Sequence, residues 1–191
     1  MSSINFVRAE LDSAFARGVR QFVVIGSRPW LREVFDTTPG RTLRVFAVDE
    51  EQPSDSPATF VATQFASEPL QVALKKSSFD QLKASLFVWL GGAGYSTVDA
   101  TLASLAFIAS LPTGSGVVFD YTVERTSVLS RAHTALHALA SRTLMACGSV
   151  KHHIQPLAVA AMLRGLGFQT IVDLAQDRNQ VGGEHLISAV V

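Results

Sequence analysis

The stretch Gln-Phe-Val-Val-Ile-Gly-Ser-Arg-Pro-Trp-Leu-Arg, residues 21–32, decides how the rest of the chain is read. Residues 22–25 form an unbroken β-branched and aromatic run, typical of a strand buried on both faces of a parallel sheet. Gly26 ends the run where the backbone must turn, and Pro29 suits the first position of a helix, because its missing N–H needs no partner there. Strand, glycine turn and helix N-terminus form the unit with which open α/β proteins hold nucleotide-like ligands. A Gly-x-Gly turn would carry a second glycine at position 28, where Arg28 stands instead and leaves less room for a ligand.

The composition indicates an ordered globular protein. The chain has 191 residues, 48% of them hydrophobic and 17% charged, which predicts a single domain over residues 1–191 with a substantial core. The 16 basic and 16 acidic residues cancel, so we expect no general attraction to nucleic acid or to an anionic membrane. The single Cys147 cannot form an internal disulfide, the first residues lack the layout of a signal peptide, and the most apolar window, residues 102–111, is too short to span a bilayer. These features predict a cytoplasmic protein.

The hydrophobic pattern predicts strands and helices in alternation along most of the chain. Strands are expected at residues 21–25, 43–48, 59–65, 86–90 and 117–121, and helices at residues 4–18, 29–36, 69–78, 97–110, 124–146 and 156–166. Such alternation gives a parallel sheet with right-handed crossovers. The last two strands, at 170–174 and 185–191, are joined by a short polar loop that has no helix, so they must pair antiparallel. A mostly parallel sheet with a C-terminal antiparallel hairpin resembles the Rossmann-like methyltransferases that use S-adenosylmethionine, which implies an α/β fold with seven strands in the order 3-2-1-4-5-7-6.

Two helices carry more detailed expectations. The helix at residues 4–18 is expected to end at Gly18 as a C-cap glycine, and its apolar positions are Phe6, Leu11, Ala14 and Phe15. The helix at residues 97–110 is expected to be capped by Thr97. Its predicted apolar stripe consists of Leu102, Leu105, Ala106 and Ala109.

Several segments, taken in order, resemble the leucine carboxyl methyltransferase family. Residues 8–26 resemble the family's Arg-Thr-x-x-Asp…Gly-x-x-Gln-Val-Val-x-Leu-Gly-Ala-Gly segment, and Phe-Ala-Val-Asp at 46–49 resembles its Phe-Glu-Val-Asp. Trp-Leu-Gly-Gly-Ala-Gly-Tyr-Ser at 89–96 resembles its Trp-Glu-Gly-x-x-x-Tyr-Leu, and residues 114–121 and 163–168 fall in register. The resemblance covers nearly all of this chain but only part of a typical family member, and the order and spacing of the motifs carry it.

The resemblance implies a site for S-adenosylmethionine. Its predicted residues are Arg8, Gly26, Ser27, Asp49, Gln64, Leu90 and Gly91. In the family, the arginine at position 8 binds the methionine carboxylate, and an acid such as Asp49 accepts hydrogen bonds from both ribose hydroxyls. Gln64 stands where the family has an acid that contacts the adenine, and Leu90 and Ala47 stand where it has glutamates. The family's N-terminal helical lid has no counterpart in the sequence.

Two residues are predicted for the substrate pocket. Tyr95 belongs to a glycine-rich loop after the strand at 86–90, where ligands lie in such sheets, and anchoring of its own loop is the alternative. Arg28 is compatible with filling the cofactor pocket, with binding a phosphate at a helix N-terminus, or with a surface position.

No metal site and no catalytic residue are predicted. His133 and His137 lie four apart on one helical face, but no third ligand accompanies them. The sequence has neither a Gly-x-Ser-x-Gly elbow nor a Cys–His nucleophile arrangement. Methyl transfer from a sulfonium depends mainly on proximity and in-line orientation, so the absence of an evident base does not exclude it.

Three functions remain open from the sequence. The first is an S-adenosylmethionine-dependent methyltransferase that transfers a methyl group to oxygen of an unknown small molecule or carboxylate. The second is a degenerate, non-catalytic relative that acts as a binding or assembly module. The third is a Rossmann-like domain that binds another nucleotide or an anion at Arg28. The apolar helix at residues 124–146 also suggests a homodimer, because its surface needs to be covered.

Overall fold

The computed structural model describes residues 3–26, 43–52, 58–64, 68–91, 97–122, 156–175 and 184–191. Its strands are β1 (Gln21–Ile25), β2 (Arg44–Asp49), β3 (Thr59–Ala62), β4 (Ser85–Trp89), β5 (Gly116–Thr122), β6 (Thr170–Ala175) and β7 (Glu184–Val190). Its helices are α1 (Ser3–Ala16), α3 (Leu70–Lys75), α4 (Val98–Ala109) and α6 (Pro156–Leu166). The helices expected at residues 29–36 and 124–146 lie outside the described residues.

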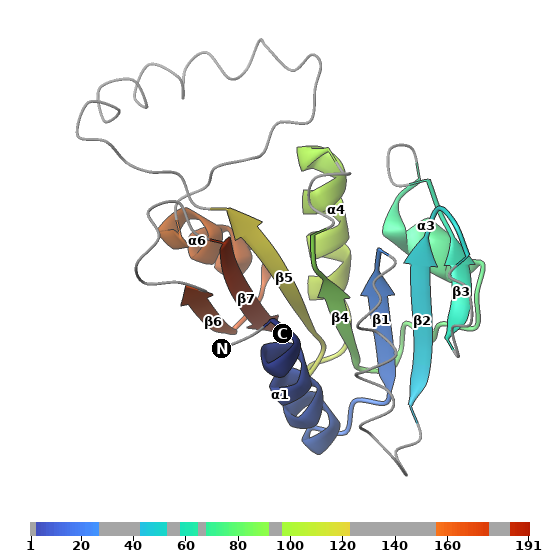
Figure 1. Cartoon of the computed structure of the whole chain (residues 1–191), viewed down its shortest axis with the longest axis horizontal. Coiled ribbons are helices and arrows are strands. Elements are labelled where there is room, and N and C mark those ends of the chain that lie inside the picture. Colours follow the sequence, from blue (N-terminus) through green and yellow to red (C-terminus); the bar gives the residue numbers. More distant parts are fainter. Residues whose placement is uncertain are drawn as a thin grey trace.

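The strands form one seven-stranded sheet in the order β3-β2-β1-β4-β5-β7-β6 (Figure 1). The first five strands pair in parallel, and β7 pairs antiparallel with both β5 and β6. The predicted fold class, strand order and C-terminal hairpin are therefore confirmed. The predicted third strand is shorter than expected, because β3 ends at Ala62 and not at residue 65.

The sheet has an apolar cluster on each face, since successive residues of a strand point to opposite sides. Val23 and Ile25 of β1 belong to the cluster that includes residues of α3, α4 and α6. Phe22 and Val24 belong to the cluster on the other face, which includes residues of α1. Figure 1 shows the same division, with α1 on one side of the sheet and the other three helices behind it. Burial on both faces explains the continuous apolar runs of β1 and β4.

The helix α1 ends as expected, but one of its predicted core positions differs. Gly18 has φ of 90°, a left-handed conformation that glycine adopts without a steric penalty, and this confirms its predicted C-cap role. Phe6, Leu11 and Ala14 are buried. Phe15 is only partly buried, because its ring packs beneath the guanidinium of Arg20, 3.8 Å from the ring centroid, and not in the sheet-facing core.

The helix α4 confirms the predicted cap and corrects the predicted stripe. The Thr97 hydroxyl oxygen accepts a hydrogen bond from the Ala100 N–H at 3.2 Å. The buried positions are Ser104, Leu105, Phe107 and Ile108, whereas Leu102 is half-buried and Ala106 is exposed. Ser104 can face the core because its hydroxyl donates to the Ala100 carbonyl of its own helix at 2.8 Å.

Candidate functional site

The carboxyl ends of β3, β2, β1 and β4 form one continuous edge of the sheet, which we call the carboxyl edge. Ile25 at the end of β1 pairs with Val48, and Asp49 at the end of β2 pairs with Ala62. Val24 pairs with Val88 of β4, so the residues that follow β1 and β4 are level with each other. The register therefore brings the predicted site residues Gly26, Asp49, Gln64, Leu90 and Gly91 to this edge. Ligands of open α/β sheets bind at this edge.

Gly26 makes the turn that the sequence predicts. Its φ is 84°, in the left-handed region, and its N–H donates to the Val48 carbonyl at 2.9 Å. Among the described residues, no atom lies within 4 Å of the position that a Cβ would occupy. A glycine here thus satisfies the backbone geometry and leaves space beside the end of β1.

Asp49 lies next to this space, at the end of β2, and is half-buried. Its Oδ1 accepts the Glu50 N–H at 2.7 Å, and its backbone carbonyl accepts the Thr63 N–H at 3.0 Å. Within the described part of the chain, the side chain makes no other hydrogen bond. One carboxylate oxygen is therefore held by the backbone, and the other, which has no partner among the described residues, can accept a hydrogen bond from a ligand.

The end of β3 departs from the sequence prediction. Gln64 is exposed, whereas Thr63, one residue earlier, is 4% exposed. The Thr63 hydroxyl is shielded from solvent and has no hydrogen-bond partner among the described residues. A buried hydroxyl without a partner destabilises a protein by about 1–3 kcal/mol. Sequence reasoning missed Thr63, and the available signal was a polar residue directly after a strand that ends earlier than expected.

Leu90 and Gly91 follow β4 with different roles. Leu90 is buried in the apolar cluster on the α1 face, so it contributes a core contact and no polar group to the edge. Gly91 has φ of 62°, and its N–H donates to Oδ1 of Asp120 in β5 at 2.6 Å. This hydrogen bond ties the loop after β4 to the neighbouring strand.

Arg8 lies in α1, on the α1 face of the sheet. It is half-buried, and its Nε is shielded from solvent. Two residues further on, Glu10 accepts a hydrogen bond from the hydroxyl of Ser188 in β7 at 2.8 Å. Ser188 is level with Val118 of β5, which is level with Val88 of β4. Because α1 runs toward the start of β1, Arg8 lies about 3 Å nearer to the carboxyl edge than Glu10 does.

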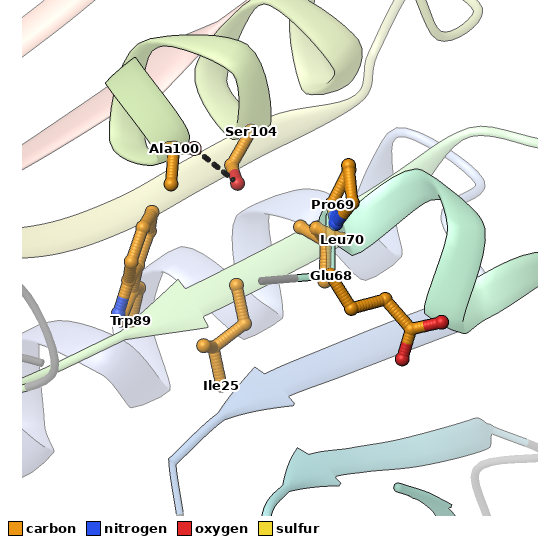
Figure 2. Close-up of a pocket in the computed structure, with 7 residues that line it drawn as sticks. All are labelled: Ile25, Glu68, Pro69, Leu70, Trp89, Ala100 and Ser104. Atoms are coloured by element: carbon orange, nitrogen blue, oxygen red, sulfur yellow. Dashed lines mark hydrogen bonds between the residues drawn. The ribbon is translucent and has the colours of Figure 1, made fainter. Parts of the chain in front are cut away.

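A small hollow opens between α3 and α4, above the ends of β1 and β4 (Figure 2). Its lining residues are Ile25, Glu68, Pro69, Leu70, Trp89, Ala100 and Ser104. Its volume is about 10 Å³, which is room for about one water molecule. The Ser104 hydroxyl is bonded within its own helix, and the Glu68 carboxylate pairs with Lys76. This hollow is therefore too small to hold a cofactor.

Several predicted residues lie outside the part of the chain that the structure describes. These are Ser27, Arg28, Tyr95, His133 and His137, together with the helix expected at 124–146 and the homodimer inferred from it. Within the described residues, no group of three or more His, Cys, Asp or Glu side chains is arranged to hold a metal ion. The helices among them include none that is long and apolar enough to cross a membrane.

Comparisons with known proteins give structural likeness but no sequence match. No family model matches the chain, and no curated protein matches it. The fold is similar to a SAM-dependent methyltransferase from Archaeoglobus fulgidus, with 13% identity, a TM-score of 0.59, and coverage of 100% of this chain and 95% of that protein. It is also similar to the N-methyltransferase NodS from Bradyrhizobium japonicum, solved with S-adenosyl-L-homocysteine, with 13% identity, a TM-score of 0.54, and coverage of 99% and 88%.

A third structural similarity covers all of this chain but only part of the other protein. The chain matches LepI, solved in complex with SAM, with 16% identity and a TM-score of 0.56 over 100% of this chain but 47% of LepI. The chain thus spans about half the length of that protein. Together these likenesses show that the chain has the Rossmann-like methyltransferase fold.

Proposed function

We propose that residues 1–191 form one methyltransferase-like unit that binds S-adenosylmethionine at the carboxyl edge and transfers its methyl group to a small molecule. The observation that carries this proposal is the left-handed Gly26 with open space beside it, next to the half-bonded carboxylate of Asp49. When bound, the cofactor supplies an electrophilic methyl group on a sulfonium.

The residues at the edge fit the parts of this cofactor. Asp49 would accept hydrogen bonds from the ribose hydroxyls, and the turn at Gly26 would let the backbone approach the ligand closely. The Thr63 hydroxyl, buried without a partner among the described residues, would gain one from the adenine. Arg8 on α1 would bind the methionine carboxylate with its guanidinium.

Within this class we propose a relationship to the leucine carboxyl methyltransferases, with O-methyl transfer to a small molecule or carboxylate. The order of the family-like segments supports it, as does the position of Gly26 and Asp49 at neighbouring strand ends. Ser27 and Gly91 would line the same site, and Tyr95 and Arg28 the substrate pocket.

A second candidate is a non-catalytic binding module, and one observation favours it. Ala47 and Leu90 occupy positions where that family has glutamates, and both are buried in the apolar cluster on the α1 face, at 4% and 7% exposure. The chain has thus replaced two polar positions with core contacts.

Titration calorimetry with S-adenosylmethionine and S-adenosylhomocysteine separates the two candidates. We expect wild-type binding in the micromolar range and a loss of at least about tenfold in Asp49→Ala, because a charge-assisted hydrogen bond contributes about 1.5–3 kcal/mol. Glu50→Ala is the matched control, since it removes the same charge from the adjacent exposed position and should bind within about twofold of wild type. A folded wild-type protein that releases no heat at millimolar ligand would favour the binding module.

A further inference from the structure

Three polar side chains from three strands meet at the end of the C-terminal hairpin. The Tyr121 hydroxyl of β5 donates to Oδ2 of Asp173 in β6. The Nδ1 of His185 in β7 lies 2.9 Å from Oδ1 of Asp173 and 3.4 Å from the Tyr121 hydroxyl. The Tyr121 and His185 rings lie 5.3 Å apart between centroids. We call these three residues the hairpin triad.

The hairpin triad lies beyond the end of β4, two strands away from it. Trp89 pairs with Phe119, so Tyr121 is level with Gly91, and Tyr121 pairs with His185. Adjacent strands are about 4.8 Å apart, which places the β7 backbone about 10 Å from the line of β4. The triad therefore borders the proposed cofactor site and does not belong to it.

The hydrogen bonds of the hairpin triad select one form of His185. A carboxylate can only accept, so the proton of the neutral imidazole lies on Nδ1, where it is donated to Asp173. This leaves Nε2 with a lone pair, and Nε2 has no hydrogen bond within the described residues. The triad thus presents a basic nitrogen with a fixed orientation.

Tyr121 keeps Asp173 in place as the acceptor. The phenol is 8% exposed, and burial, together with its hydrogen bond to Asp173, raises the pKa of Tyr121 above its ordinary value. Tyr121 therefore stays protonated and donates to one carboxylate oxygen while His185 uses the other. Asp173 and Tyr121 are the titratable partners of His185 among the described residues, and α6 packs on the same face through the apolar Val159 and Leu163.

The side chains of the hairpin triad are mostly buried but remain partly exposed to solvent. The His185 and Asp173 side chains are 17% and 23% exposed. Solvent therefore reaches part of the His185 and Asp173 side chains.

We propose that Nε2 of His185 accepts a proton from the hydroxyl group of a small-molecule acceptor, with Asp173 and Tyr121 as positioning residues. The proton passes from the acceptor O–H to Nε2, and the oxygen keeps the electron pair with which it attacks the methyl carbon. The bond between the methyl carbon and the sulfur of S-adenosylmethionine would break with its electrons on sulfur, which would become neutral, and the imidazolium would return its proton to solvent.

The proposed role of His185 indicates the chemical class of the methyl acceptor. It rests on the proposed methyltransferase function. A carboxylic acid is already ionised near neutral pH, so a base has no proton to remove from it. A phenol or alcohol is protonated there and gains nucleophilicity when a base takes its proton. We therefore infer a phenolic or alcoholic hydroxyl as the acceptor, and not a carboxylate.

The first test needs neither cofactor nor acceptor. Diethyl pyrocarbonate modifies unprotonated imidazole nitrogens, and peptide mapping by mass spectrometry separates His185 from the other four histidines of the chain. We expect His185 to be modified in wild type and at least about tenfold more slowly in Asp173→Asn, because the amide donates to Nδ1 and moves the proton to Nε2. Long-range ¹H–¹⁵N NMR should show the same change of tautomer. An unreactive wild-type His185, or the same tautomer in both proteins, would overturn the proposal.

The second test uses the loaded enzyme with a matched variant. His185→Asn keeps an amide group where Nδ1 lies, so it retains the bond to Asp173 and lacks Nε2. We expect this variant to melt within a few degrees of wild type, to bind S-adenosylmethionine equally, and to lose labelled methyl transfer to a series of phenols. Transfer to the matching benzoates only, transfer to neither series, or full activity in His185→Asn would overturn the assignment.

The two proposals fail in different ways. A protein with a reactive His185 that does not bind S-adenosylmethionine in calorimetry would refute the methyltransferase and, with it, the role of His185 in methyl transfer, and would leave only the accessible, unprotonated Nε2 established. A protein that binds the cofactor but has an unreactive His185 would refute the proton acceptor alone.

Discussion

The two edges of the parallel sheet differ in how their buried polar side chains are hydrogen-bonded and in how closely they are packed. At the amino edge, where the strands begin, the buried polar side chains Gln21, Ser85 and Ser115 all take part in hydrogen bonds. At the carboxyl edge, Gly26 has open space beside it and the Thr63 hydroxyl has no partner among the described residues. The amino edge therefore stabilises the fold. The carboxyl edge contributes less stability, and it is the edge at which a ligand is expected.

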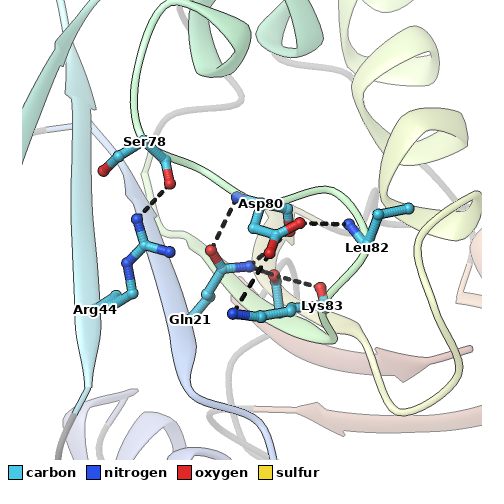
Figure 3. Close-up of polar contacts among 7 residues, drawn as sticks. Gln21, Arg44, Ser78, Asp80, Leu82 and Lys83 are labelled. Atoms are coloured by element: carbon cyan, nitrogen blue, oxygen red, sulfur yellow. Dashed lines mark hydrogen bonds and ion pairs between the residues drawn. The ribbon is translucent and has the colours of Figure 1, made fainter.

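Figure 3 shows how the amino edge is held. The Gln21 amide nitrogen donates to the Asp80 carbonyl at 2.8 Å and to the Ser85 hydroxyl at 3.0 Å, and its oxygen accepts the Asp80 N–H at 3.0 Å. Arg44 of β2 donates to the Ser78 carbonyl. One buried amide therefore fixes the loop between α3 and β4 against the start of β1.

The largest expected effect is at this amide. Gln21→Ala removes three hydrogen bonds, leaves the Asp80 backbone groups without their partner and opens a cavity, so we expect a loss of about 3 kcal/mol in the free energy of unfolding. Urea denaturation followed by circular dichroism measures it. Gln64→Ala, an exposed glutamine at the opposite edge, is the control and should stay within about 0.5 kcal/mol of wild type. Equal losses in both variants would remove the distinction between the edges.

A smaller loss is expected at the glycine turn. Gly26→Ala places a Cβ at φ of 84°, where an L-residue is strained by about 1–2 kcal/mol, although no described atom obstructs it. Gly165→Ala is the matched control, because this glycine lies in the helix α6 with no described atom within 4 Å, and alanine should stabilise it by about 0.5–1 kcal/mol. Thermal melting of both variants should thus shift in opposite directions. The Gly26 variant should also bind S-adenosylmethionine more weakly.

At Thr63 the expected change in stability has the opposite sign. Thr63→Val replaces a buried hydroxyl that has no described partner with a methyl group of similar shape, so we expect a gain of about 1 kcal/mol in unfolding free energy. The same variant should weaken binding of S-adenosylmethionine in calorimetry. Ser85→Ala removes a buried hydroxyl that is fully bonded at the amino edge, and it should destabilise the fold by about 1 kcal/mol. A destabilised Thr63→Val protein would mean that the hydroxyl has a partner in the native fold.

The sheet could be predicted from the sequence because each of its central strands is marked by a local run of apolar residues. Continuous apolar runs marked β1, β2, β4 and β5, and the residues that follow β1 and β2 necessarily reach the carboxyl edge, which placed Gly26 and Asp49 there. The adenine contact at Gln64 stays a prediction. Side chains alternate along β3 and just beyond it, so Thr63 lies on the same side as the buried Val61 and Gln64 on the same side as the exposed Ala62. For this reason Thr63 and not Gln64 is buried.

The hairpin triad could not be found from the sequence in the same way. Tyr121 and Asp173 are 52 residues apart, and Tyr121 and His185 are 64 apart. Their meeting depends on the order β5-β7-β6 and on a diagonal pairing across the hairpin, which no local pattern encodes. The face of α4 was misjudged for a related reason. Ser104 is polar by type, but its hydrogen bond within the helix lets it pack in the core, while the apolar Ala106 is exposed.

The smallest expected effect concerns the charge at the amino edge. The Leu82 N–H donates to Oδ1 of Asp80 at 3.0 Å, and this bond, together with Lys83 and Arg44, holds the pKa of the Asp80 carboxyl below its ordinary value of 3.8. A carboxyl whose pKa is lower in the folded state stabilises the fold above its unfolded pKa, and this contribution is lost as the pH falls through the folded value. Asp80→Asn should therefore be slightly less stable than wild type at pH 7, and the gap should close below about pH 3.8. Urea denaturation of both proteins across this range measures the gap. A gap that stays constant into acid would show that the amide disturbs packing and that the carboxylate charge contributes nothing to this edge.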